Sequence, residues 1–275
     1  MRASSAPPSR YPLAPSQDAA MRIATWNVNS VRARLPRFLP WLAEHRPDVV
    51  LLQETKCVDD CFPREPIEEL GYNIETFGQK TYNGVAILAK SRITDVQRGL
   101  RDGEEDGQAR VLGAMVEDVL VLSVYVINGQ AVGTPAYAKK LEWLARLRKL
   151  MWEKYIMTEK VVMGGDFNVT FDDRDVYDPD AWREKILCST PEREALMRVM
   201  DCGLKDAFRH HVQEGGHYTW WDFRTRGFSR GHGLRIDHLL MSPPALRVCK
   251  SVEIDRAARD GEKPSDHAPV VATLE

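Results

Sequence analysis

The sequence lacks several features that would place it in a particular class of protein. No apolar run approaches the ~18 residues that a membrane-spanning helix needs, which argues against a membrane protein. The five cysteines are odd in number and lack metal-site spacing, which argues against a disulfide framework and for a reducing compartment. No short-period repeat occurs. With 43% hydrophobic and 28% charged residues in a chain of 275, the composition fits one large α/β enzyme domain.

The first twenty residues differ from the rest of the chain. Residues 1–20 lack apolar periodicity and are rich in Pro, Ser and Ala, so they are predicted to form a disordered leader before a single domain at 21–275. The segment has no continuous apolar core, which excludes an ordinary secretory signal. A transit peptide and a misassigned start codon are the alternatives.

A carboxylate and an imidazole stand side by side near the C-terminus. Asp266 and His267 precede an apolar run at 270–274 that is typical of a strand. Because adjacent side chains on a strand face opposite ways, a turn must bring both groups to one site. Such a pair alone is usually surface or capping chemistry, so its meaning depends on the other polar residues of the chain.

Oxygen-rich side chains end three apolar, β-branched runs, at 23–30, 49–56 and 161–169. The first run carries Asn27 and the second carries Glu54. In the third, Asp166 and Asn168 are two residues apart, so strand alternation points both to the same face. Carboxylate and amide oxygens are the ligands that Mg²⁺ and Mn²⁺ prefer. Together these segments favour a hard-metal site over separate strand-end caps.

These segments and others resemble the exonuclease III family of the endonuclease/exonuclease/phosphatase superfamily, the group of bacterial apurinic/apyrimidinic (AP) endonucleases. The matching segments occur in the family's order and lie at 25–34, 52–56, 82–87, 165–168, 233–237 and 265–269. The resemblance implies a DNase I-like α/β fold, a four-layer sandwich in which two packed mixed β-sheets are flanked by helices. Further strands for it are predicted at 85–89, 119–127 and 235–241.

Two helices are predicted between the motifs. Residues 135–160 carry apolar side chains at spacings of three and four, and their cations, Lys140 among them, are assigned to a solvated surface. Thr190 is predicted to cap a second helix, with Pro191 in its first position and Gly203 at its end.

The resemblance implies a divalent-metal site. Glu54 and Asp266, with Asn27 nearby, would be the principal ligands, and Asp166 and Asn168 would hold any second ion. The full set of metal candidates is Asn27, Glu54, Asp166, Asn168, Asp266 and His267. The sequence leaves open one ion or two, and Mg²⁺ or Mn²⁺.

The resemblance also implies catalytic roles. Asp166 would orient or deprotonate the attacking water, and Asn168 would hydrogen-bond the water or the phosphoryl oxygens. His267 would contact the phosphate while Asp237 orients its ring, an arrangement that keeps an imidazole cationic. Tyr125 would donate a hydrogen bond to the same phosphate.

DNA contacts are implied for a third group of residues. Trp220 and Leu234 would line a pocket for a flipped abasic sugar, with Trp221 behind them, in a stretch that interleaves aromatic residues with arginines. Ile127 and Phe171 replace prolines that are common in the family, so the neighbouring turns stay open. Further candidates for the DNA-facing rim are Arg32, Lys56, Tyr82, Asn83 and Asn128.

The overall charge opposes a broad nucleic-acid surface. The net charge is −2 and the pI is near 6.4, whereas phosphate contact normally needs basic residues. The acidic stretches at 102–106 and 172–175 are therefore expected to lie away from the DNA, and bound metal to offset the carboxylates of the site. Binding is predicted to be weak and salt-sensitive.

The sequence predicts a divalent-metal-dependent DNA phosphodiesterase of base-excision repair, which cuts 5′ to abasic sites and processes 3′ ends as an exonuclease and phosphatase. Its partner would be double-stranded DNA with abasic sites or 3′ ends, and the protein would be a cytoplasmic monomer. One alternative is a superfamily phosphodiesterase for RNA, lipid or inositol phosphate. The other is a non-catalytic DNA-binding scaffold, which the presence of every catalytic candidate disfavours.

Overall fold

The computed structural model describes residues 20–104, 107–155 and 159–275. The predicted leader, apart from Ala20, lies outside these residues. Within the described ranges, none of the helices combines the length and the apolar character needed to cross a bilayer.

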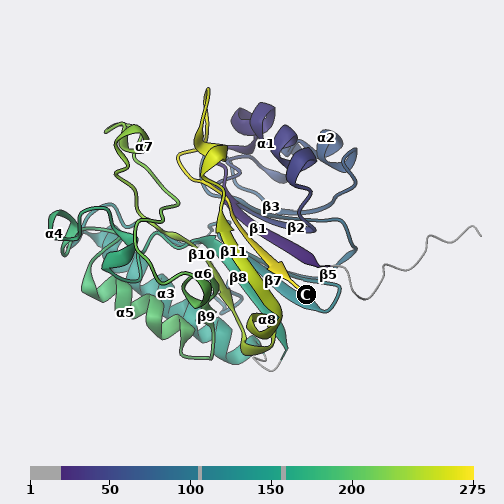
Figure 1. Ribbon diagram of the computed structural model, residues 1–275. Coiled ribbons are helices and arrows are strands. Elements are labelled where there is room, and N and C mark those ends of the chain that lie inside the picture. Colours follow the sequence, from purple (N-terminus) through teal and green to yellow (C-terminus); the bar gives the residue numbers. More distant parts are fainter. Residues whose placement is uncertain (1–19, 105–106, 156–158) are drawn as a thin grey trace, which may run out of the picture.

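Two six-stranded mixed sheets form the centre of the molecule (Figure 1). The first contains, in spatial order, β11 (Cys249–Ile254), β12 (Val270–Leu274), β1 (Met21–Asn27), β2 (Val49–Gln53), β4 (Val85–Ala89) and β3 (Asn73–Phe77). The second contains β5 (Ile93–Arg98), β6 (Val111–Val116), β7 (Val119–Tyr125), β8 (Lys160–Asp166), β10 (Asp237–Met241) and β9 (Lys205–Asp206).

Helices cover the outer face of each sheet (Figure 1). The helices α1 (Val31–His45) and α2 (Arg64–Glu68) lie over the first sheet, and α3 (Pro135–Lys154) and α5 (Thr190–Met200) lie over the second. The predicted four-layer sandwich is therefore confirmed. Shorter helices are η1 (Asp59–Cys61), η2 (Asp173–Asp175), α4 (Pro179–Trp182), α6 (Ala207–His211), α7 (Gly227–Arg230), α8 (Pro243–Val248) and η3 (Arg256–Arg259).

The inner faces of the sheets pack through an apolar layer that includes Ile23, Leu51 and Leu239. Gly164 lies at a close approach in this layer, because a Cβ there would lie 2.7 Å from Leu51 Cδ1 and 2.8 Å from Leu239 Cδ2. A fully buried hydrogen bond of 3.0 Å from Gln53 Nε2 to Ser123 Oγ also joins the sheets. The first contact lies midway along β2 and β10, and the second lies at the end of β2, so together they fix the two sheets relative to each other up to the point where Glu54 emerges.

Each sheet contains one parallel pair of strands, and the candidate site lies at the carboxyl ends of both pairs. The strands β1 and β2 run parallel in the first sheet, as β7 and β8 do in the second. Asn27 ends β1, Tyr125 ends β7 and Asp166 ends β8, while Glu54 directly follows β2. Antiparallel pairing of β10 with β8 sets Asp237 opposite Asp166.

Two sequence predictions about the helices are wrong. Lys140 does not face solvent: it is fully buried and forms an ion pair with buried Glu192. The N-cap of α5 is Ser189 and not Thr190, because Glu192 then occupies the third helical position and accepts from the Ser189 backbone N–H at 3.2 Å. Both corrections involve Glu192, which joins α5 to α3.

Candidate active site

Asn27 connects the two carboxylates that end the strands. Its Nδ2 donates to Glu54 Oε1 at 2.8 Å and to Asp166 Oδ2 at 2.9 Å. Its Oδ1 accepts from the backbone N–H of Asn29 at 3.0 Å. In this arrangement the amide bridges two carboxylates that would otherwise repel each other, and it presents a donor and not an oxygen to them.

Left-handed backbone occurs at three of the site residues. Glu54 has φ +50°, Lys56 has φ +53° and Asn168 has φ +51°. Such conformations are uncommon outside glycine, and they concentrate at functional sites where the surrounding structure holds them. The turn after β2 brings Lys56 Nζ within 2.7 Å of Glu54 Oε2, so a cation lies beside the carboxylate.

Asp166 is almost completely buried, with 1% of its surface exposed. Its Oδ1 accepts from the backbone N–H of Asn168 at 2.9 Å. Burial is the largest influence on this carboxyl group and, with the charges of Asp237 and Glu54, raises its pKa to about 7 against the opposing charge of His267. A carboxylate with that pKa can accept a proton near neutral pH.

His267 forms a dyad with Asp237. Its Nδ1 lies 2.8 Å from Asp237 Oδ2, and its Nε2 lies 3.8 Å from Asp166 Oδ2. Burial alone would lower the pKa of His267, but the carboxylates of Asp237 and Asp166 outweigh it and raise the pKa to about 10. The imidazole is therefore cationic at neutral pH.

A possible metal-binding group consists of Glu54, Asp166 and His267, whose donor atoms all lie within 4.8 Å of one another. The two carboxylates suit a hard divalent cation, so they fit the group that the family implies, whereas His267 as a cation would donate hydrogen bonds instead of ligating the metal. Asp266 lies outside this set. Its Oδ1 accepts from Asn29 Nδ2 at 2.8 Å and its Oδ2 from Trp220 Nε1 at 3.1 Å, so its predicted role as a principal ligand stays a prediction.

Tyr125, the last residue of β7, lies beside Glu54 and Asp166, and Asn128 in the following turn contacts Asn168. Burial, together with the charges of Glu54 and Asp166, raises the pKa of the Tyr125 hydroxyl well above its usual value, so it stays a donor. Asn128 Nδ2 donates to Asn168 Oδ1 at 2.9 Å. The unusual Ile127 therefore does not prevent contact between the two amides.

A buried ion pair contacts the backbone of Asn128 and Asn168 from the interior of the protein. Lys140 Nζ donates to the backbone carbonyl of Asn168 at 2.6 Å and to that of Asn128 at 3.2 Å, while it pairs with Glu192. Sequence reasoning missed this pair. The signal was present, because Lys140 precedes Leu144 by four residues and so lies on the buried face of α3.

Residues 217–234, called the recognition segment after the role that the sequence predicts, border the candidate site through contacts of Trp220 with Asp266 and His267. Trp220 and Leu234 exchange backbone hydrogen bonds of 2.9 Å in both directions. Trp220 also forms an isolated antiparallel β-bridge with His267. Leu234 is fully buried in an apolar cluster against which the half-buried Trp220 packs, and Trp221 is buried against Phe228. Trp220 is thus the member of the predicted pocket that a substrate can touch.

The predicted rim residues come from three separate loops and helices. Arg32 is exposed in the first turn of α1, Lys56 follows β2, and Tyr82 is 68% exposed. Asn83 is buried, and its Nδ2 donates to Gln79 Oε1 at 2.9 Å, so its side chain serves the loop itself.

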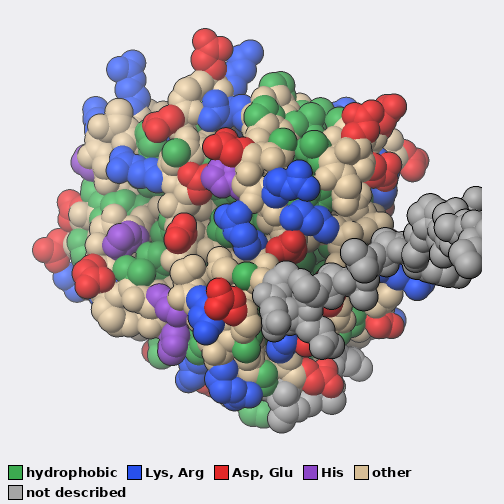
Figure 2. Space-filling model, turned by 45° about the vertical axis from the view of Figure 1, so that its right-hand side comes forward, with side chains coloured by type: hydrophobic (Ala, Val, Ile, Leu, Met, Phe, Trp, Pro, Cys, Tyr) green, Lys and Arg blue, Asp and Glu red, His purple; other side chains and the backbone are tan. Residues whose placement is uncertain are grey.

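Charges of both signs are interspersed over the face shown in Figure 2, with several Lys and Arg side chains near its centre. Part of the acidic charge is neutralised within the chain. Asp102, in the first acidic stretch, accepts from Arg146 at 2.6 Å, and Asp173, in the second, pairs with Arg193 at 2.9 Å. Attraction of a polyanion would therefore depend on the local cations of the site.

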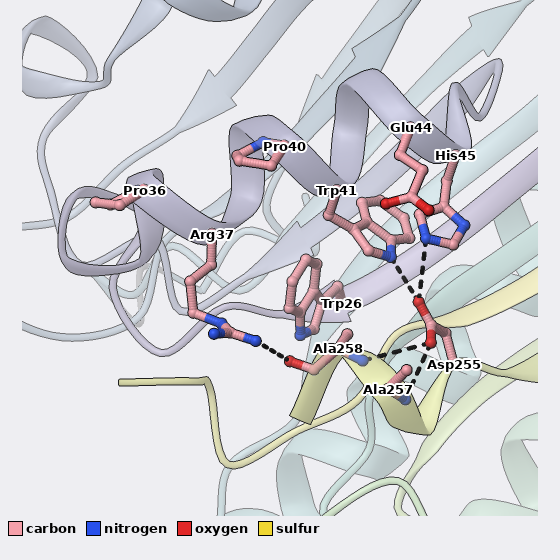
Figure 3. A pocket seen from close by; sticks show the side chains of 10 residues that line it. All are labelled: Trp26, Pro36, Arg37, Pro40, Trp41, Glu44, His45, Asp255, Ala257 and Ala258. Atoms are coloured by element: carbon pink, nitrogen blue, oxygen red, sulfur yellow. Dashed lines mark hydrogen bonds and ion pairs between the residues drawn. The ribbon is translucent and has the colours of Figure 1, made fainter. Parts of the chain in front are cut away.

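A pocket of about 410 Å³ lies between α1 and η3, away from the metal-binding group (Figure 3). Asp255 accepts there from Trp41 Nε1 at 2.7 Å and from the backbone N–H of Ala257 at 3.1 Å, and His45 Nε2 lies 3.5 Å away. Its central carboxylate is satisfied by the protein itself, so this pocket adds no candidate to the catalytic centre.

Comparisons with known proteins agree with this geometry. A sequence model of the Endonuclease/Exonuclease/phosphatase family matches residues 24–267. The exodeoxyribonuclease III of Haemophilus influenzae is 34% identical, over 92% of this chain and 99% of its own. Two solved structures are similar: a 3′ phosphatase from Neisseria bound to a product DNA hairpin (TM-score 0.90, 44% identity, 93% of this chain and 99% of that one) and an AP endonuclease from Archaeoglobus fulgidus (TM-score 0.89, 35% identity, 93% and 99%).

Proposed function

Since this chain belongs to the endonuclease/exonuclease/phosphatase family, we propose that it is a divalent-metal-dependent DNA repair nuclease that cleaves 5′ to abasic sites and processes 3′ ends. The observation that carries the proposal is the group of Glu54, Asp166 and His267 donors within 4.8 Å of one another, with the imidazole held by Asp237. A scaffold without activity would not need to retain this arrangement.

Each of these residues has a separate role in phosphoester hydrolysis. Asp166 accepts a proton from the attacking water, for which a pKa of about 7 is suitable. Asn168 orients the water or a phosphoryl oxygen, and the cationic His267 and the hydroxyl of Tyr125 donate to the developing charge on the phosphate. These groups are fixed before substrate arrives, so little reorganisation accompanies the reaction.

We assign metal binding to Glu54 and Asp266 as principal ligands, with Asn27 nearby, and to Asp166 and Asn168 for any second ion. His267, as a cation, would serve the phosphate instead. Mg²⁺ or Mn²⁺, when bound, would supply charge neutralisation and a more acidic water. Asn27 presents Nδ2 to the carboxylates, which suits a residue that orients the ligands.

DNA is the substrate that the recognition segment favours. Trp220 offers an aromatic surface beside His267, and the arginines of the segment provide cations for the backbone. The relatives support the same choice, since one is an exodeoxyribonuclease, one a 3′ phosphatase and one an AP endonuclease. The proposal includes action as a monomer in the cytoplasm. RNA, lipid or inositol phosphate remains the alternative substrate.

One experiment tests the proposal directly. Purified protein is incubated with duplexes that carry an abasic-site analogue, a recessed 3′ end or a 3′ phosphate, each with Mg²⁺, Mn²⁺ or EDTA. Metal-dependent incision or 3′ processing is expected, and the same data rank the activities. Absence of turnover on every duplex would overturn the proposal and favour another phosphoester substrate.

A further inference from the structure

A second pocket, of about 280 Å³, lies between the recognition segment and the end of β11. Its lining residues are Gly216, His217, Tyr218, Trp221, Gly231, Ile254 and Arg256. The lining contains no carboxylate, whereas it includes a guanidinium, an imidazole, a phenol and an indole. Its polar side chains can therefore all donate hydrogen bonds, a combination that suits an anionic ligand.

Arg256 is the cation of this pocket. Its guanidinium carbon lies 4.9 Å from the ring centre of Phe228 and 5.9 Å from that of Trp221. Among the described residues, no carboxylate forms an ion pair with this exposed side chain. The aromatic rings hold the cation in position without neutralising it, so its N–H groups remain available to an anion.

Trp221 contributes a second, independent observation. The residue is 1% exposed, and its Nε1 has no acceptor within the described part of the chain. That atom lies against Gly233 and is closed to solvent, so a ligand in the pocket would contact the rest of the indole ring and would reach the N–H only after a shift of the segment.

The pocket between α1 and η3 provides a contrast. There the carboxylate of Asp255 faces the cavity and already accepts hydrogen bonds from the protein (Figure 3). The lining of the pocket beside Arg256 has the opposite character, since it contains a cation and no carboxylate.

We propose that the pocket beside Arg256 binds a phosphate group of the DNA strand other than the scissile phosphate. The proposal rests on the proposed function for its ligand, because a DNA nuclease meets a polyanion with phosphates on both sides of the cleaved bond. Trp221 connects the two sites, since its backbone N–H donates to the carbonyl of Asp266 at 3.1 Å. Phosphate bound there would fix the recognition segment against the catalytic loop.

The test uses the full-length protein and duplexes in which one phosphate at a time, never the scissile one, is replaced by a neutral methylphosphonate. In the wild type, one position is expected to raise KM about tenfold, the effect of one good contact. In Arg256→Gln the same replacement should change KM less than twofold, because the partner is already lost. In His217→Gln, the neutral linkage at this position should raise KM by less than it does in the wild type.

Arg198→Gln is the matched control, since Arg198 is an exposed arginine that pairs with Glu194 on α5, far from the pocket in sequence. It should retain the wild-type dependence on the neutral linkage. Thermal unfolding of each variant establishes that all are folded. Equal KM changes in the wild type and Arg256→Gln at every linkage would overturn the assignment to the DNA strand.

A second measurement separates the two sources of phosphate. A deoxynucleoside 5′-monophosphate and inorganic phosphate are titrated by calorimetry, which needs no turnover and so remains informative if the proposed nuclease activity fails. Binding that Arg256→Gln abolishes, without any linkage effect, would support a phosphate site for free nucleotide and overturn the DNA-strand assignment. No Arg256-dependent effect in either measurement would overturn the site itself.

Discussion

The catalytic floor, formed by Asn27, Glu54, Asp166, Asp237 and His267, and the recognition segment at 217–234 are built in opposite ways. In the floor, side chains emerge from the ends of paired strands and bond to one another, and Asp166 and His267 are 1% and 4% exposed. The recognition segment has one short helix, α7, and exposes Phe223 by 44% and the Arg224 side chain by 89%.

This difference shows that the catalytic floor must be rigid. Buried carboxylates must keep their partners, because an unpaired buried charge is strongly destabilising. The floor therefore depends on sheet register. The recognition segment is held by hydrogen bonds between loops, such as those that join Trp220 to Leu234, and by the rings that Arg256 and Arg259 approach. Changes in the floor should alter the chemical step, and changes in the segment should alter the choice of substrate.

The largest expected effect is that of Asp166→Asn. An amide cannot accept the proton of the attacking water, so kcat should fall about 10²–10⁴-fold while DNA binding persists. Single-turnover cleavage and fluorescence anisotropy would measure both. Asp180→Asn, at an exposed position on α4, is the control. Substantial residual cleavage would show that Asp166 is not the proton acceptor. The contrast between the catalytic floor and the recognition segment would then no longer hold.

Lys140→Met tests the buried ion pair between Lys140 and Glu192. This change leaves Glu192 buried without its cation and should lower the free energy of unfolding by about 3–5 kcal/mol. The double variant Lys140→Met/Glu192→Leu should recover most of that stability, because apolar replacement of a buried ion pair is often nearly neutral.

The double variant should nevertheless be slow, since the carbonyls of Asn128 and Asn168 have lost the ammonium donor that positions their loops. We expect kcat to fall about tenfold with KM changed less than twofold. Lys139→Met, an exposed neighbour on α3, should have no effect on either. A double variant with wild-type kcat would show that the ion pair serves only stability.

Trp220→Ala tests the recognition segment. Loss of an aromatic surface for a flipped sugar or base should reduce kcat/KM at an abasic site by about tenfold, and removal of a simple 3′ phosphate by much less. The ratio of the two activities on matched duplexes is the measurement. Equal losses would mean that Trp220 acts on the floor through its hydrogen bond to Asp266, not on substrate choice.

The last prediction concerns pH, and it leaves the chain unchanged. Burial raises the pKa of Asp166 to about 7, so below pH 7 the carboxyl group is protonated and cannot accept a proton. At limiting metal, cleavage should be about tenfold slower one pH unit below that pKa than on the plateau above it. Saturating metal should move the acidic limb of the pH–rate profile to lower pH, because a bound cation favours the ionised carboxylate. A limb near pH 4 at every metal concentration would assign it to another group.

Some elements were readable from local sequence because their pattern and their environment agree. The strands β4 (Val85–Ala89) and β12 (Val270–Leu274) coincide with the predicted runs, since both are apolar, β-branched and bounded by turns. Other runs were predicted two or three residues too long, as β1 and β2 show by ending at Asn27 and Gln53. There the polar residues have left the ladder to enter the site, which apolar periodicity alone does not show.

The sequence by itself determined the strands, the polar residues at their ends and the resemblance that implies metal-dependent phosphoester chemistry, because these depend on residue type and short spacing. Only the tertiary structure decided that Lys140 is buried, that Asp266 bonds to Asn29 and Trp220, and that Arg256 lies against Phe228 without an acidic partner among the described residues. Each of these facts joins residues far apart in the chain. Burial and charge pairing arise when the sheets and loops pack, and no local pattern contains that information.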